Sequence, residues 1–271
     1  FSNMKEWLKE FDHTIFLSKI YQDYLFSKKY LKNKFSIIPN GADEREFLND
    51  NILNIKNKLS IPIESKVILH VGSFTGIKGQ FEAMKIFERS GLKNTYLVLN
   101  GNEVSANDSV KGKIKRYVNK IYLLPRLKTI AKKMNCTQQI IFTDLCRSEL
   151  VSLFKESNLM LFPSRIECSP LVIFEAAASS LPFYTSEAGN ARELVEWLDG
   201  GWIIPTRHVK NGQVTVDIEK ASKEIESLIN DPKELLDTGN RIRKSWQDKY
   251  TWDKISKMYE LTYKQALGVI K

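Results

Sequence analysis

The fold of this chain is decided by residues 162–178, which read FPSRIECSPLVIFEAAA. The apolar run at residues 159–162 predicts a buried strand, which Pro163 ends. Ser169 followed by Pro170 predicts a helix that begins at Pro170, because a serine hydroxyl accepts from a free first-turn amide and proline has no amide to leave unpaired. The first-turn amides and the positive end of the helix dipole favour an anion. The stretch therefore predicts a strand, a loop and a helix, with an anion site at the helix start.

Two carboxylates flank this predicted anion site. Glu167 lies in the loop, and Glu175 lies eight positions later in the helix. If a phosphate rests on the helix start, one glutamate can reach the near end of the ligand and the other its far end. Glutamate is also a good helix former, so the alternative is that Glu175 only decorates an amphipathic helix.

A second candidate loop, residues 72–79, reads GSFTGIKG. It is not a Walker loop, which needs four residues between its glycines and then Lys-Ser or Lys-Thr. Its glycines permit close approach of the backbone to a ligand, and Lys78 could hold a phosphate as a point charge before a helix start. The alternative is a glycine-rich turn with a solvated lysine.

Short apolar runs alternate with helical patterns over most of the chain. Strands are expected at residues 12–18, 35–38, 67–71, 96–99, 140–143, 159–162, 183–185 and 202–204. Helices are expected at residues 19–31, 81–90, 149–155 and 191–198, with three more beyond residue 217. From residue 67 onward this order predicts an α/β fold, a Rossmann-like doubly wound parallel sheet, whose ligands bind beyond the carboxyl ends of the strands.

Several motifs occur together and in order: Ile-Pro-Asn-Gly at 38–41, the loop ending in Lys78-Gly79, Pro-Ser at 163–164, and Glu-Ala-Ala-Ala at 175–178. The two glutamates, with seven residues between them, resemble the E-x7-E motif of retaining glycosyltransferases of family four. The resemblance implies the C-terminal half of a GT-B fold. It covers nearly the whole chain except residues 102–139 and 208–215.

The resemblance also implies roles for individual residues. Glu175 would hold the ribose hydroxyls of a nucleotide sugar and Glu167 would contact the hexose, while Lys78 matches a lysine of the family's diphosphate clamp. Ser73 departs from the arginine usual there, and Asp144 stands where glycine is usual. The donor-binding residues implied are Gly72, Ser73, Lys78, Thr143, Asp144, Leu145, Glu167, Ser169, Pro170, Leu171 and Glu175, with Glu167 and Lys78 as catalytic candidates.

The expected function is transfer of a sugar from a nucleotide-diphosphate donor, with a UDP-sugar as first candidate, to a cell-surface glycan or lipid-linked saccharide, with retention. The alternative is a catalytically silent GT-B module that binds a nucleotide or a partner. We expect residues 1–38 to be the remnant of an N-terminal acceptor domain, residues 39–245 the donor domain, and residues 246–271 a helix that crosses back. The chain would then be a fragment.

Composition sets the remaining limits. The 271 residues are 42% hydrophobic, and the three cysteines and three histidines are not spaced as metal ligands. Asp-x-Asp is absent, so no metal site and no further cofactor are expected. We find no run of the roughly 20 apolar residues that a membrane span needs and expect a cytoplasmic protein.

The region with least resemblance is strongly basic. Residues 109–134 hold nine basic residues and no acid, against a chain total of 41 basic and 32 acidic residues. An amphipathic basic helix there could contact the inner face of an anionic membrane through Lys111, Lys113, Lys115, Arg116 and Lys120. The alternative is a solvated face. Because no nucleic-acid-binding motif is present, we expect no nucleic-acid partner.

Overall fold

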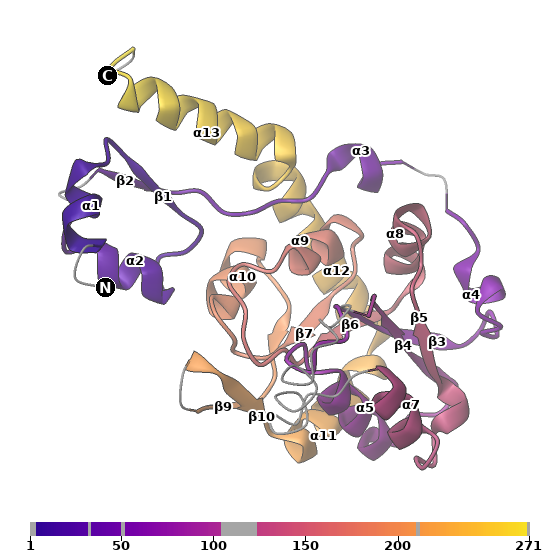
Figure 1. The fold of residues 1–271 in the computed structure, drawn as a ribbon. Coiled ribbons are helices and arrows are strands. Elements are labelled where there is room, and N and C mark those ends of the chain that lie inside the picture. Colours follow the sequence, from indigo (N-terminus) through magenta and orange to yellow (C-terminus); the bar gives the residue numbers. More distant parts are fainter. Residues whose placement is uncertain (1–3, 32–33, 50–51, 104–123, 210–211, 270–271) are drawn as a thin grey trace.

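The computed structural model describes residues 4–31, 34–49, 52–103, 124–209 and 212–269, and its largest element is a parallel sheet (Figure 1). The strands are β3 (Lys66–Val71), β4 (Thr95–Asn100), β5 (Ile140–Thr143), β6 (Leu159–Phe162), β7 (Phe183–Thr185) and β8 (Trp202–Ile203). They lie in the order β5-β4-β3-β6-β7-β8. The chain therefore first winds outward from β3 through β4 to β5 and then returns to β6 on the other side of β3. This is the doubly wound order, with its switch point between β3 and β6.

Helices cover both faces of this sheet because alternate strand residues face opposite sides. Val67 and Leu69 pack in one core with α8 (Arg147–Glu156), α9 (Leu171–Ala178), α10 (Ala191–Leu198) and α12 (Pro232–Lys249). Ile68 packs in a second core with α5 (Gln80–Ser90), α7 (Leu124–Ala131) and α11 (Ile218–Ile229). The predicted doubly wound fold is confirmed.

A small unit precedes the sheet. Strands β1 (Thr14–Phe16) and β2 (Phe35–Ile37) pair in parallel, and α1 (Met4–Glu10) and α2 (Gln22–Ser27) accompany them. The predicted helix at 19–31 was wrong in extent, because the Ser18 hydroxyl accepts from the amides of Ile20 and Tyr21 and forms a turn there.

The small unit is bonded to the sheet domain through a buried carboxylate. Glu193 of α10 accepts from the Ser18 hydroxyl at 2.6 Å and from the Lys19 amide at 2.9 Å. Glu193 therefore holds two parts of the chain together.

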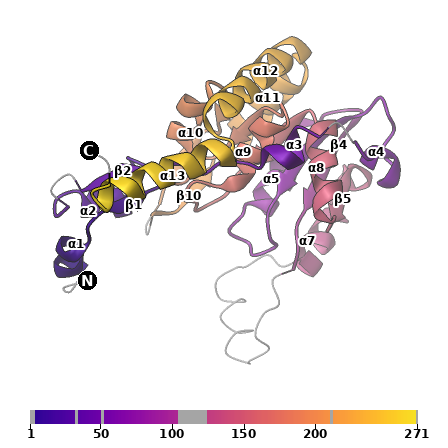
Figure 2. The ribbon, with the colours of Figure 1, turned by 90° about the horizontal axis from the view of Figure 1, so that it is seen from above.

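A linker with α3 (Glu44–Phe47) and α4 (Ile55–Lys58) leads from this unit into β3. At its start the Ala42 amide donates to the Tyr250 carbonyl at the end of α12, and Ala42 forms a bridge with Thr251. The last helix, α13 (Trp252–Ala266), then extends from α12 back toward β1 and β2 (Figures 1 and 2). The expectation that residues 246–271 cross back to an acceptor domain stays a prediction.

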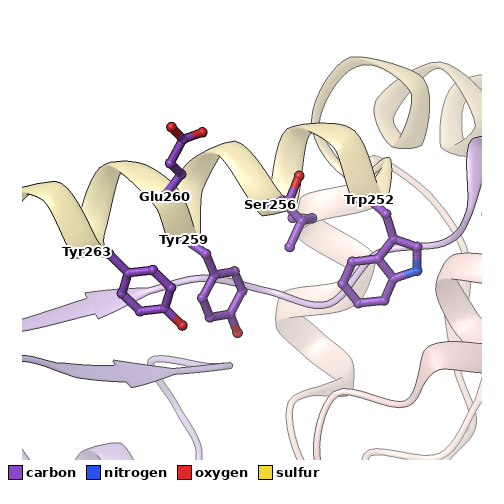
Figure 3. A pocket seen from close by; sticks show the side chains of 6 residues that line it. Trp252, Ser256, Tyr259, Glu260 and Tyr263 are labelled. Atoms are coloured by element: carbon purple, nitrogen blue, oxygen red, sulfur yellow. The ribbon is translucent and has the colours of Figure 1, made fainter.

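One face of α13 is aromatic and only partly covered. Trp252, Tyr259 and Tyr263 line a pocket on it together with Ser256 and Glu260 (Figure 3). The rings of Tyr259 and Tyr263 lie 6.2 Å apart, and Tyr263 is 57% exposed.

One region differs from the sequence-based prediction, and another lies outside the residues that the structure describes. The hairpin of β9 (Thr206–His208) and β10 (Val214–Val216) was not predicted, because β9 has only polar side chains and β10 is only three residues long. Lys111, Lys113, Lys115, Arg116 and Lys120 of the predicted basic helix lie outside the described residues. Helix α7 follows the undescribed residues and begins at Leu124.

Candidate functional site

Two loops meet where the strand order reverses. The loop after β3 and the loop after β6 leave neighbouring carboxyl strand ends, where doubly wound folds bind their ligands. The Arg165 amide donates to the Ile77 carbonyl at 2.8 Å, and the Arg165 guanidinium binds Glu82 of α5. The structure thus brings the two sequence-predicted loops into direct contact.

Lys78 and Glu167 join these loops. The Lys78 ammonium lies 2.7 Å from Glu167 Oε1, and the Ser164 hydroxyl donates to the same oxygen at 2.6 Å. The Glu167 side chain is 8% exposed, whereas that of Lys78 is 30% exposed. Glu167 is therefore held in one orientation, and Lys78 keeps access to solvent at the site.

The backbone at Gly72 and Ser73 is fixed from α5. The Gln80 side-chain amide donates to the carbonyl of Gly72 at 3.0 Å and to that of Ser73 at 2.9 Å. Gly79 has φ of +80°, and a Cβ there would lie 2.0 Å from the Pro163 carbonyl oxygen. Glycine is thus required at the point where the two loops touch.

The start of α9 differs from the prediction in one respect. Helix α9 begins at Leu171, with Pro170 as its N-cap, and the Ser169 hydroxyl does not cap it. Ser169 is buried with a φ of +53°, and within the described part of the chain its hydroxyl has no hydrogen-bond partner. The prediction that the Ser169 hydroxyl caps α9 was wrong, because the left-handed backbone turns this side chain away from the first amides of the helix.

Two asparagines hold Ser169 in this conformation. The Asn40 side chain donates to the Ser169 carbonyl at 2.7 Å, and Asn190 Oδ1 accepts from the Ser169 amide at 2.8 Å. A left-handed conformation is unfavourable for a residue other than glycine, so it persists where surrounding contacts impose it. The unpartnered serine hydroxyl and the first turn of α9 are thereby fixed beside the Glu167 loop.

Glu175 lies on the inner side of α9 and is paired. Its Oε1 lies 2.7 Å from a terminal nitrogen of Arg147, the first residue of α8, and its side chain is 12% exposed. Burial raises the pKa of Glu175, and the Arg147 charge opposes that rise. The same guanidinium binds both carboxylate oxygens of Glu46 in α3 and lies over the Phe47 ring. Glu175 is therefore part of an ion-pair chain and does not simply decorate the helix surface.

Thr143 ends β5, and Asp144 and Leu145 follow it at the same edge of the sheet. The Leu145 amide donates to the Asn100 side chain at 3.0 Å, and Asp144 is exposed. This segment leads directly into Arg147. The structure thus connects it to Glu175 through α8.

Arg147, Glu46 and Gln80 were not identified from the sequence as site residues. Each is a common polar residue in or beside a helix, and only the packing of distant segments places it at the site. Among the described residues, no group of three or more His, Cys, Asp or Glu side chains is arranged to hold a metal ion. Within the same residues, no helix has the length and apolar character needed to cross a bilayer.

The fold is a doubly wound α/β sheet, and comparison with known proteins identifies the family of the chain. The chain belongs to the family of glycosyl transferases group 1, which matches residues 51–245. It is 25% identical over 249 residues to an uncharacterized glycosyltransferase of Methanocaldococcus jannaschii, covering 88% of this chain and 56% of that protein. It is 22% identical over 228 residues to N-acetyl-alpha-D-glucosaminyl L-malate synthase of Bacillus anthracis, covering 84% of this chain and 53% of that enzyme.

A solved structure shows the same architecture. HepE of Anabaena in complex with UDP and glucose superposes with a TM-score of 0.75 at 16% identity, covering 97% of this chain and 66% of that one. The fold is that of GT-B glycosyltransferases. The chain spans about half the length of the curated relatives it matches.

Proposed function

We propose that this chain forms the donor-binding half of a retaining, nucleotide-sugar-dependent glycosyltransferase of family four. One observation carries the proposal: two loops with anion-binding chemistry converge at the switch point of the sheet, linked by Lys78 and Glu167 at 2.7 Å. Glu175 lies further along, in the middle of α9. A nucleotide sugar offers a matching order of groups, with hexose, diphosphate and ribose in sequence.

In this proposal the leaving diphosphate is stabilised electrostatically. Lys78 supplies a positive charge, and the first-turn amides of α9 supply donors and the positive end of a helix dipole. Glu175 accepts from the ribose hydroxyls. The base lies toward Thr143, Asp144 and Leu145.

The reaction proposed is front-face substitution. An acceptor hydroxyl oxygen forms the new bond to the sugar carbon while the bond to the diphosphate oxygen breaks, and the hydroxyl proton passes to that departing oxygen. Glu167 accepts hydrogen bonds from Lys78 and Ser164. It is therefore better suited to accept hydrogen bonds from hexose hydroxyls than to attack the sugar as a nucleophile.

The proposal also divides the chain between acceptor and donor binding. We infer that residues 1–38 are the end of an acceptor domain, residues 39–245 bind the donor, and residues 246–271 cross back. The acceptor would be a glycan or lipid-linked saccharide, reached from the cytoplasmic face of a membrane. A silent binding module is not favoured, because the relatives named above are glycosyltransferases or a synthase.

A thermal-shift screen of the chain with UDP, GDP, ADP and CMP and their sugars tests the proposal. A ligand that binds only the folded state raises the melting temperature, because it stabilises that state by RT ln(1 + [L]/Kd). UDP is the first candidate, because one structural neighbour holds UDP with glucose. Absence of any shift with all four nucleotides, at concentrations well above usual dissociation constants, would contradict it.

We expect Lys78→Ala to weaken binding of the selected nucleoside diphosphate by about three- to tenfold, because one partly exposed charge-assisted contact to phosphate is removed. Isothermal titration measures this change. Lys85→Ala is the control, since Lys85 lies on α5 and pairs with Glu88. Equal affinities of wild type and Lys78→Ala would rule out Lys78 as a phosphate ligand.

Glu167→Ala should leave the affinity for free nucleoside diphosphate nearly unchanged and reduce the preference for the intact nucleotide sugar. The reason is that Glu167 is placed at the hexose end, beyond Lys78. The ratio of the two dissociation constants, diphosphate against sugar donor, is the measurement. If Glu167→Ala weakens both ligands equally, Glu167 does not read the sugar.

A further inference from the structure

Arg147 connects the proposed ribose-binding carboxylate to the linker that precedes the sheet. One terminal nitrogen of its guanidinium lies 2.7 Å from Glu175, while its Nε lies 3.0 Å and 3.1 Å from the two carboxylate oxygens of Glu46. Its planar group also lies 5.6 Å from the centre of the Phe47 ring. The three partners come from α9 and α3, so the guanidinium is fixed by two elements other than its own.

This arrangement bears on the charge of Glu175. A carboxylate as buried as Glu175 is unfavourable as an anion unless a positive charge and hydrogen bonds compensate it. The charged groups that act on Glu175 are Arg147 of α8, which favours its ionised form, and Glu46 of α3, which opposes it. Arg147 therefore provides the compensation, and Glu46 neutralises the second half of the guanidinium.

The geometry also limits which oxygen of Glu175 is free. Arg147 binds Oε1 and thereby restricts the orientation of the carboxylate. The other oxygen and the remaining lone pairs of Oε1 are left for ligand donors. In the ionised form both oxygens act only as acceptors, whereas a protonated carboxyl group uses one oxygen as a donor.

We propose that Arg147, anchored by Glu46, is a positioning residue that holds the Glu175 carboxylate as an oriented anion and so sets selectivity for ribose over deoxyribose. This inference rests on the proposed binding of ribose hydroxyls by Glu175. It places the linker helix α3 within the nucleotide site, through Glu46. Selectivity at the ribose is therefore governed by a residue that need not touch the nucleotide.

The test uses titration of the diphosphate that binds best among UDP, GDP and ADP, together with its 2′-deoxy form. The variants are Arg147→Met, Arg147→Lys and Glu46→Gln. Arg45→Met is the matched control, since Arg45 lies beside Glu46 in α3 and pairs with Asp43. Each dissociation constant is measured over about pH 5 to 8.

We expect Arg147→Met to lower the ribose preference about three- to tenfold, and Glu46→Gln to lower it less. As the pH is lowered, affinity for the ribose form should begin to fall at a higher pH in Arg147→Met than in wild type. The reason is that loss of the positive charge raises the pKa of Glu175 further, so the carboxylate is protonated sooner. Arg147→Lys should restore the pH dependence more fully than the ribose preference, because lysine keeps the charge and loses the fork. Arg45→Met should resemble wild type.

Equal weakening of the ribose and deoxyribose ligands, with no change in pH dependence, would show a structural role only and would overturn the inference. Glu46→Gln carries the test if Arg147→Met fails to fold. Glu175→Ala separates this inference from the proposed function. If Glu175→Ala also leaves the ribose preference unchanged, the proposed function fails; if it abolishes the preference and the Arg147 and Glu46 variants do not, only the inference fails.

Discussion

Replacing Glu175 by alanine is expected to weaken nucleoside diphosphate binding by about 10- to 150-fold. Two ribose hydroxyls that donate to one carboxylate make charge-assisted hydrogen bonds, and their loss is worth about 1.5 to 3 kcal/mol. The carboxylate is buried and oriented by Arg147, so little of this interaction is lost to screening. Isothermal titration against wild type measures the change.

The same substitution should leave the fold intact, which keeps the binding result interpretable. Burial raises the pKa of Glu175 in the folded protein, so this group favours folding at low pH, and that contribution is lost as pH rises through the folded pKa. At neutral pH the alanine variant should therefore be at least as stable as wild type. Arg147 would retain Glu46 as its partner. A large drop in melting temperature together with unchanged affinity would contradict both the assigned role and this charge argument.

Gly79→Ala is expected to destabilise the protein by about 3 kcal/mol or more and to abolish tight nucleotide binding. A Cβ at Gly79 would lie 2.0 Å from the Pro163 carbonyl oxygen, and the φ of +80° is itself unfavourable for alanine. The clash falls where the Lys78 loop meets the Glu167 loop. Relief of the clash must push the two halves of the site apart.

Gly91→Ala is the matched control for this prediction. Gly91 has a φ of +62°, but a Cβ there would meet nothing within 4 Å. It should cost only about 1 to 2 kcal/mol, from backbone strain alone, and should leave nucleotide affinity unchanged. Urea unfolding of both variants measures the difference. Equal destabilisation by the two substitutions would show that the contact with Pro163 is not critical.

The strands of the central sheet were predictable because they are buried on both faces. Continuous apolar runs placed β5, β6 and β7 with their observed bounds, and β3, β4 and β8 to within one residue at each end. Helices α5, α8 and α10 followed from the spacing of apolar residues. These signals are local, so neighbouring residues suffice to reveal them.

Predictions from neighbouring residues were wrong where a polar group forms a hydrogen bond with a segment that is distant in the sequence. The helix expected at 19–31 is shortened to α2, where Ser18 forms a turn and binds Glu193. Hairpin β9–β10 was missed, and its Val214 amide donates to the Arg165 carbonyl of the Glu167 loop. The hydroxyl of Ser169 was expected to cap α9, but Asn40 and Asn190 hold its backbone in a left-handed conformation.

The sequence by itself determined the fold class and the chemical character of the two loops, since apolar runs, glycines and a helix start are properties of adjacent residues. Tertiary structure alone decided which charges meet. Lys78 and Glu167 are 89 positions apart, and Arg147 and Glu46 are 101 apart. Such pairs form only when the strand order brings their elements to one edge of the sheet. The residues adjacent to each member of a pair in the sequence do not reveal which residue is its partner.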